Sequence, residues 1–168
     1  MPQPQIAVQL HNITAGYQKK TVLPDISLSI QKGLIHVIIG RSGAGKTTLL
    51  KVINGLITTD TGAVHIFGTR LSRATRGKLG STIGYIPQDM GLIETMTARD
   101  NVLMGSLARV NPLLSLLNIF PKEEIEYAAS LLTVVGLSQK GNEPVYTLSG
   151  GEKRRVAIAR ALMQKPSI

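Results

Sequence analysis

The sequence contains no cysteine and no tryptophan, and aromatic residues make up only 4% of its 168 residues. The absence of cysteine excludes disulfide bonds and cysteine-ligated metal sites, which fits a reducing compartment. The longest apolar stretches, around residues 35–39 and 113–120, are far shorter than the roughly 20 residues that a membrane-spanning helix needs. Met1–Gln5 has no basic region followed by an apolar run, so no signal peptide is expected. We therefore expect a protein that is soluble or peripheral to a membrane.

Acidic residues are also scarce, since 10 Asp and Glu against 19 Lys and Arg give a net charge of +9. Such an excess is typical of nucleic-acid binders, of proteins that bind nucleotide phosphates, and of proteins at anionic membrane faces. The cations are dispersed apart from Lys153-Arg154-Arg155, so the charge by itself does not distinguish these classes from an ordinary solvated surface. A hydrophobic content of 43% is sufficient for one globular domain with an aliphatic core.

The first half of the chain reads as strands with one helix. Alternating or short apolar runs predict strands at Ile6–Leu10, Ile13–Tyr17, Ser27–Ile30, Ala63–Phe67 and Thr82–Ile86. The continuous apolar run Ile35–Ile39 predicts a buried strand of a parallel sheet. A helix is predicted at Lys46–Asn54, and Gly55 is a suitable stop. These elements indicate a mixed α/β core over residues 1 to about 90.

The second half of the chain reads as helices. Helices are predicted to begin at Thr97, Pro121 and about Ser149 and to end near Leu107, Val135 and Gln164. Thr97 and Asp100 form a capping pattern, while Glu123 and Glu124 lie near the positive end of the second helix. Between the first two helices lies an apolar segment, Asn111–Phe120, interrupted by proline. We expect a helical subdomain from about residue 91 to 150, followed by the last helix over about 149–164.

A complete phosphate-binding motif, G-x-x-x-x-G-K-[ST], follows the apolar run at residues 35–39: Gly40-Arg41-Ser42-Gly43-Ala44-Gly45-Lys46-Thr47. Glycines let the backbone curl so that consecutive N–H groups point at one phosphate, and the following helix adds its positive end. Lys46 can reach the β- and γ-phosphates, and the Thr47 hydroxyl can ligate Mg²⁺. The sequence therefore predicts ATP and Mg²⁺ binding at residues 40–48, Thr48 included.

A second candidate anion site opens the last helix at Leu148-Ser149-Gly150-Gly151-Glu152. Ser149 and Glu152 form a capping box, and the two glycines leave the first N–H groups of the helix sterically open. Capping boxes are common, so this string alone also fits an ordinary helix start. The basic continuation Arg155-Val156-Ala157-Ile158-Ala159-Arg160-Ala161-Leu162 extends the pattern along the helix.

The two motifs and their spacing resemble the ATP-binding domains of ABC transporters. That resemblance implies a P-loop NTPase core of the ABC type with an N-terminal antiparallel β subdomain and a helical subdomain. It also implies a head-to-tail dimer of two ATPase subunits, in which Ser149, Gly150, Gly151 and Glu152 contact ATP held by the other subunit. Tyr17 then lies where the family stacks an aromatic ring on adenine. Gln88 lies where a glutamine approaches Mg²⁺ and the attacking water and contacts the transmembrane partner, so Lys46 and Gln88 are the catalytic candidates.

Within the family, the stretch from Asn101-Val102-Leu103-Met104-Gly105 to Pro121-Lys122-Glu123 resembles the ATP-binding subunits of phosphonate importers. Glu152 departs from that pattern, because many importer subunits have Gln there. The resemblance also implies a catalytic Asp and Glu on a strand after the last helix, whereas the chain ends at Lys165-Pro166-Ser167-Ile168. We therefore expect the C-terminal strands to be lacking, apolar surface to be exposed, and hydrolysis by this chain alone to be severely impaired.

The leading functional hypothesis is the ATP-binding subunit of an ABC importer at the cytoplasmic face of the membrane, peripheral to a separate permease. A solute-binding protein would act with it indirectly, and no nucleic acid is expected. The alternatives are a soluble ABC ATPase that acts in translation or DNA repair, and a nucleotide-binding fragment without turnover. A single phosphate loop and the lack of a long coiled-coil insertion weigh against the soluble ATPase. No residue is expected to contact the transported solute.

Overall fold

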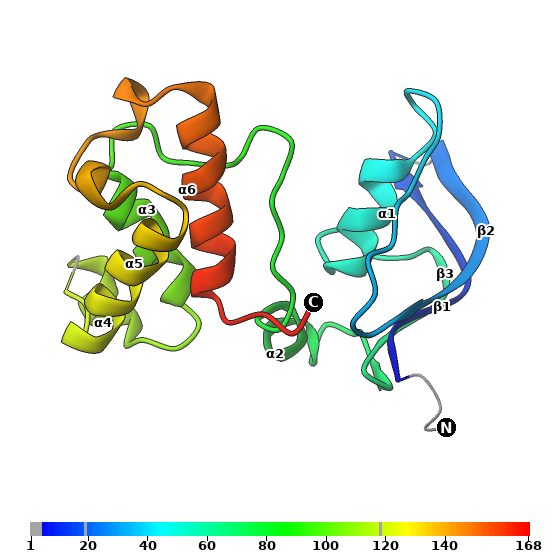
Figure 1. The fold of residues 1–168 in the computed structure, drawn as a ribbon. Helices are drawn as coiled ribbons and strands as arrows, with labels where there is room; N and C mark the ends of the chain where they lie inside the picture. The colour runs from blue at the N-terminus through cyan, green and yellow to red at the C-terminus, as the bar shows by residue number, and fades with distance from the viewer. Residues whose placement is uncertain (1–4, 19, 118) are drawn as a thin grey trace. The chain divides into compact units, whose positions relative to one another are not determined.

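The amino-terminal half folds around a four-stranded antiparallel sheet of order β2-β1-β3-β4 (Figure 1). Its strands are β1 (Ile6–Tyr17), β2 (Lys20–Gln31), β3 (Thr61–Ile66) and β4 (Thr69–Arg70). The computed structural model describes residues 5–18, 20–117 and 119–168. It divides into two units, one formed by the residues up to Ile83 with Ile168 and the other by Gly84–Ser167.

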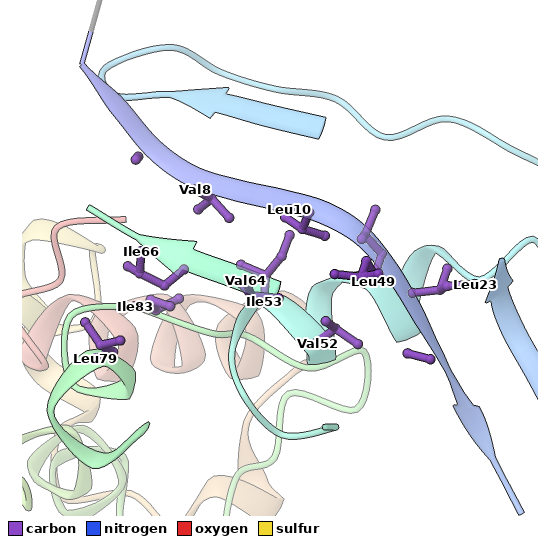
Figure 2. Packing of buried hydrophobic residues seen from close by; sticks show 13 residues of the cluster. Val8, Leu10, Leu23, Leu49, Val52, Ile53, Val64, Ile66, Leu79 and Ile83 are labelled. Carbon is purple, nitrogen blue, oxygen red and sulfur yellow. The ribbon is translucent and has the colours of Figure 1, made fainter. Parts of the chain in front are cut away.

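The core of the first unit lies between one face of this sheet and helix α1 (Lys46–Ile53). Alternation along β1 and β3 turns Val8, Leu10, Val64 and Ile66 to the same buried face, where Val52 of α1 meets them (Figure 2). Full burial of each such side chain stabilises the unit by about 1.5–3 kcal/mol. The short helix α2 (Arg76–Gly80) contributes a further buried leucine to this core. The packing fixes α1, and with it the segment that precedes the helix.

Two of the predicted strands are wrong. Residues 35–39 and 82–86 form no regular strand, and Ile35 and Ile39 are 95% and 89% exposed. A strand is completed by hydrogen bonds to a neighbouring strand, and none of the strands in the described part of the chain pairs with either run. The expected exposure of apolar surface is therefore confirmed at residues 35–39. The strands predicted at Ile6–Leu10 and Ile13–Tyr17 form one irregular strand, β1, which pairs with β2 along its length.

The second unit is a helical cluster whose main helices are α3 (Ala98–Leu103), α5 (Lys122–Val134) and α6 (Gly150–Met163). These three helices pack against one another (Figure 1) around a second aliphatic core. Shorter elements complete the unit: the 3₁₀ helices η1 (Met104–Ser106), η2 (Ser138–Lys140) and η3 (Val145–Thr147), and α4 (Pro112–Leu116). The three predicted helices are thus confirmed, with ends shifted by a few residues.

The cap predicted for α3 is confirmed, because the Thr97 hydroxyl accepts a hydrogen bond from the Asp100 N–H at 3.1 Å. Helix α4 was not predicted. Asn111 caps it by accepting from the Leu113 N–H at 2.9 Å, and Pro112 stands in its first turn, where a missing N–H costs nothing. The proline that suggested an interruption of the apolar segment therefore marks a helix start.

The loop before α3 is organised by Asn101, a polar residue with no exposed surface. Its side-chain oxygen accepts from the Ile93 N–H at 2.8 Å, and its amide nitrogen donates to the carbonyls of Ile93 and Thr97 at 3.0 Å. A buried amide is tolerated in an aliphatic core only when its hydrogen bonds are made in this way. Asn101 thereby fixes the segment that leads from the Gln88 region into the helical cluster.

Among the helices of the described residues, none combines the length and the apolar character that a membrane span requires.

Candidate functional site

The phosphate-loop motif forms a turn between the exposed run at residues 35–39 and the first residue of α1. Gly43 and Gly45 have φ angles of +81° and +86°, in the left-handed region that favours glycine. A Cβ atom at Gly45 would lie 2.8 Å from Leu23 Cδ2, so any side chain at this position would also collide with β2. The second motif glycine is therefore required both by its backbone conformation and by the close approach of the sheet.

The amino-terminal end of α1 has free hydrogen-bond donors. The first bond of the helix runs from the Leu49 N–H to the Gly45 carbonyl at 2.8 Å, so the N–H groups of Lys46, Thr47 and Thr48 precede the intrahelical ladder. Gly45 is the cap residue, and no side chain in the described chain accepts from these donors. The turn before the helix is closed by the Ala44 N–H, which donates to the Arg41 carbonyl at 3.2 Å. Aligned, uncapped amides of this kind form an anion-binding end.

The Lys46 side chain folds back over the loop. Its ammonium group donates to the Gly40 carbonyl at 2.7 Å and to the Arg41 carbonyl at 2.8 Å. These are neutral acceptors on an exposed loop, so a phosphate oxygen offers the same cation a stronger, charge-assisted partner. The Lys46 ammonium therefore already lies within the phosphate loop, and its hydrogen bonds to the two carbonyls could be exchanged for bonds to an anion.

The remaining loop residues divide by exposure. Arg41, Ser42, Ala44 and Thr47 are exposed, whereas Thr48 is buried among the core residues of α1. An exposed threonine hydroxyl at the start of the helix suits Mg²⁺, which takes one or two protein oxygens and completes its octahedron with phosphates and water. The described residues hold no group of three or more His, Asp and Glu side chains that could bind a metal ion by themselves.

Tyr17 stands at the end of β1 in the first unit and is 44% exposed. Gln88 lies in the second unit, in a turn where its side chain is exposed. The segment after Gln88 is held to α6: Arg160 donates to the carbonyls of Met90 and Gly91. Burial lowers the pKa of Arg160 from its ordinary value, but the guanidinium remains charged. Arg160 therefore ties the Gln88 loop to the helix that carries the second motif.

The second motif forms the amino-terminal end of α6. The predicted capping box is present: the Ser149 hydroxyl accepts from the Glu152 N–H at 3.4 Å, and the Glu152 carboxylate accepts from the Ser149 N–H at 2.8 Å. Gly150 and Gly151 are exposed, and a Cβ at Gly150 would meet no atom within 4 Å. The first turn of α6 is therefore open to an approaching group.

Glu152 also contacts a residue from a different element. Its second oxygen lies 2.7 Å from the Lys140 ammonium at the end of η2. The hydrogen bond from Lys140, followed by those from the Ser149 N–H and hydroxyl, lowers the pKa of Glu152 from 4.5 to about 2. The same contact with Glu152 raises the pKa of Lys140. Glu152 is therefore ionised at neutral pH and paired with a full positive charge.

This pairing makes the stability of the helical unit depend on pH. Because the folded-state pKa of Glu152 is depressed to about 2, its contribution is fully present above its unfolded-state pKa and is lost as the pH falls from about 5 to 2. We expect Glu152→Gln to flatten the loss of stability over this range. Urea unfolding followed by helical circular dichroism at about pH 6 and about pH 3 measures the difference, since the two proteins differ only at residue 152. Parallel pH dependences for the two proteins would contradict the assignment.

Sequence reasoning missed Lys140 and Arg160 as site residues. Arg160 lay within the basic helix that was noted, but nothing in the sequence links it to the loop at residues 90–91. The sequence offered only an indirect signal for Lys140. Glu152 stands where many importer subunits have Gln, and an acidic side chain there indicates a cation nearby. Lys140 lies in η2 and Glu152 in α6, and the sequence does not show that these two elements meet.

A cavity of about 950 Å³ also lies in the first unit, where residues from the end of α1, from β3 and from the segment after β4 surround it. Arg70, Arg73 and Arg76 line it, together with apolar residues such as Val52 and Leu71. None of residues 40–48 contributes to its wall. The phosphate loop is therefore a surface turn and not part of this cavity.

The sequence matches the family described as ABC transporter over residues 23–168. Among curated proteins it is 41% identical to "Phosphonates import ATP-binding protein PhnC 1" of Nostoc sp. (strain PCC 7120), over 97% of this chain and 63% of that protein. It is 39% identical to "Phosphonates import ATP-binding protein PhnC" of Rhizobium meliloti (strain 1021), over 95% of this chain and 58% of that protein. The chain thus spans about 60% of the length of these relatives.

Among solved structures, the chain resembles a nucleotide-free ATP-binding cassette from an ABC transporter, with a TM-score of 0.79 and 30% identity over 96% of this chain and 66% of that one. It also resembles the dimeric post-hydrolysis ATP-binding cassette MJ0796 bound to ADP and Pi, with a TM-score of 0.81 and 30% identity over 95% of this chain and 70% of that one. The fold is accordingly that of an ATP-binding cassette, with its antiparallel β part and its helical part both present.

Proposed function

The chain belongs to the ABC transporter family, and we propose that it is the ATP-binding, energy-coupling part of an ABC importer. The observation that carries this proposal is the phosphate loop: an uncapped helix end, two glycines at positive φ, and the Lys46 ammonium held against the loop. A loop of this kind suits a nucleoside triphosphate with Mg²⁺. Hydrolysis of that ATP would drive solute uptake.

In this proposal each site residue has one task. The loop amides and Lys46 bind the β- and γ-phosphates, Thr47 supplies a hydroxyl to Mg²⁺, and Tyr17 stacks on the adenine. Gln88 would approach Mg²⁺ and the attacking water. Ser149, Gly150, Gly151 and Glu152 face the γ-phosphate bound by a second ATPase subunit in a head-to-tail dimer, and a dimeric cassette is among the similar structures.

The solute proposed is a phosphonate or a related anion, because relatives of about 40% identity are named as phosphonate import proteins. The partners are then a transmembrane permease, which the Gln88 loop contacts, and a solute-binding protein that acts through the permease. The chain would lie at the cytoplasmic face of the membrane as a peripheral subunit.

Equilibrium binding of a fluorescent ATP analogue in the presence of Mg²⁺ tests the proposal, with phosphate release followed in parallel. Saturable, Mg²⁺-dependent binding that unlabelled ATP competes away is the expected result. Binding without release would favour the nucleotide-binding fragment without turnover. Co-purification with ribosomes or DNA instead of a permease would favour the soluble ATPase, and an absence of any binding would overturn the proposal.

A further inference from the structure

The Glu152 carboxylate is occupied on both oxygens. One oxygen accepts from the Ser149 N–H and from the Ser149 hydroxyl, each at 2.8 Å. The other lies 2.7 Å from the Lys140 ammonium. A single carboxylate thus joins η2 to the first turn of α6.

An acidic residue at this place is at odds with anion binding. A phosphate that approaches the open first turn of α6 would meet the negative charge of Glu152, and two like charges a few ångströms apart repel strongly where water is partly excluded. A glutamine would make similar cap contacts without the charge. Glu152 is therefore compatible with an incoming phosphate only if a cation compensates it.

Lys140 is the cation in contact with Glu152. Other charged groups act on the pair, because Glu143 lies 3.9 Å from the Lys140 ammonium and Arg155 acts on it electrostatically. Lys153, also on α6, is engaged elsewhere with Glu94 at 2.8 Å. The Lys140 side chain is 38% exposed and that of Glu152 only 16%, so the carboxylate is the more enclosed member of the pair.

We propose that Lys140 is a positioning residue of the signature site: it neutralises Glu152 and holds its carboxylate on Ser149, so that the first turn of α6 accepts the γ-phosphate of a partner subunit. This inference rests on the proposed function. Lys140 itself does not touch the nucleotide. Its effect passes through Glu152, and it should disappear when residue 152 carries no charge.

The test is a double-mutant cycle on nucleotide-dependent self-association of the full 168-residue chain, measured by sedimentation with Mg²⁺ and the slowly hydrolysed analogue ATPγS. We expect Lys140→Met to weaken association about tenfold, which corresponds to the loss of one charge-assisted contact. In the Glu152→Gln background the same substitution should change association less than about twofold. Lys140→Arg, which keeps the charge, should restore association to within about threefold of the unmodified chain.

Lys122→Met is the matched control, because Lys122 forms an exposed ion pair with Glu126 on α5 at 3.5 Å. It should leave association unchanged, since exposed pairs contribute little. Melting curves confirm that each variant is folded, and Lys140→Arg keeps the inference testable should Lys140→Met unfold.

Four results would overturn the inference. Equal weakening by Lys140→Met in both backgrounds overturns the inference, because the effect of Lys140 would then not depend on the charge at residue 152. No weakening in either background also overturns it, because Lys140 would then have no influence on the site. A chain that binds the nucleotide but does not self-associate also overturns it and leaves nucleotide binding standing. A chain that binds no nucleotide overturns the proposed function itself, and the inference with it.

Discussion

Lys46→Ala is expected to weaken binding of the fluorescent ATP analogue by about a hundredfold or more, the largest effect of any single side chain of the phosphate loop. The reason is the position of the ammonium group, which donates at 2.7 and 2.8 Å to the carbonyls of Gly40 and Arg41. A cation already within the loop needs only a change of partner to reach a phosphate. Alanine removes the charge and both donors.

The substitution should affect binding far more than stability. The Lys46 bonds lie on an exposed loop, where each contributes about 1 kcal/mol to folding, whereas the packing of α1 rests on Leu49, Val52 and Ile53. Lys51→Ala, in the last turn of the same helix, is the matched control and should retain binding. Equal losses from the two substitutions would indicate general charge attraction instead of a phosphate site, and unchanged binding in Lys46→Ala would refute the loop assignment.

Gly105→Ala is expected to destabilise the helical unit by about 3 kcal/mol, near the upper end of the usual cost of overpacking a core. A Cβ at Gly105 would lie 2.3 Å from the Arg160 carbonyl oxygen and 2.7 Å from Met163 Cβ. Both neighbours belong to α6, and Met163 has no exposed surface. Because a backbone carbonyl cannot move away by changing rotamer, η1 would have to separate from α6.

Gly141→Ala is the control for this effect. Its added Cβ would meet only Leu132 Cδ1 at 3.4 Å, and Gly141 has a helical φ of −58°. We expect this variant to be within about 0.5 kcal/mol of the parent, or slightly more stable through the loss of glycine's freedom in the unfolded chain. Chemical unfolding followed by helical circular dichroism compares the two, and equal stabilities for both variants would contradict the close contact between η1 and α6.

The sequence predicted those features whose cause is local. The capping patterns at Thr97 and Ser149 became caps, because a short polar side chain and the N–H three residues later are brought together by the first turn itself. The curled backbone that the loop glycines predicted is present, with Gly43 and Gly45 at positive φ angles. The helix end predicted near Val135 was likewise correct, and Gly136 directly after it has a φ angle of +72°.

Predictions that depended on a distant partner did not follow from the sequence. The apolar run at residues 35–39 is what a buried parallel strand requires, yet a strand forms only beside another strand, and none of the described strands pairs with this run. The helix at residues 112–116 was missed although its signals are local. Pro112 was interpreted as an interruption of the apolar segment, whereas it stands in the first turn of a helix that Asn111 caps.

The sequence by itself determined that this protein has a glycine-rich phosphate-loop motif before a helix and a second helix whose first turn carries two glycines, because spacing and residue type dictate both. Only the tertiary structure decided which charges meet there. Lys140 reaches Glu152 from another element, Arg160 reaches the carbonyls after Gln88, and Asn101 fixes the loop that leads into the helical cluster. Contacts between residues far apart in the chain follow from how the helices pack. Packing depends on the whole core, and no local sequence pattern specifies it.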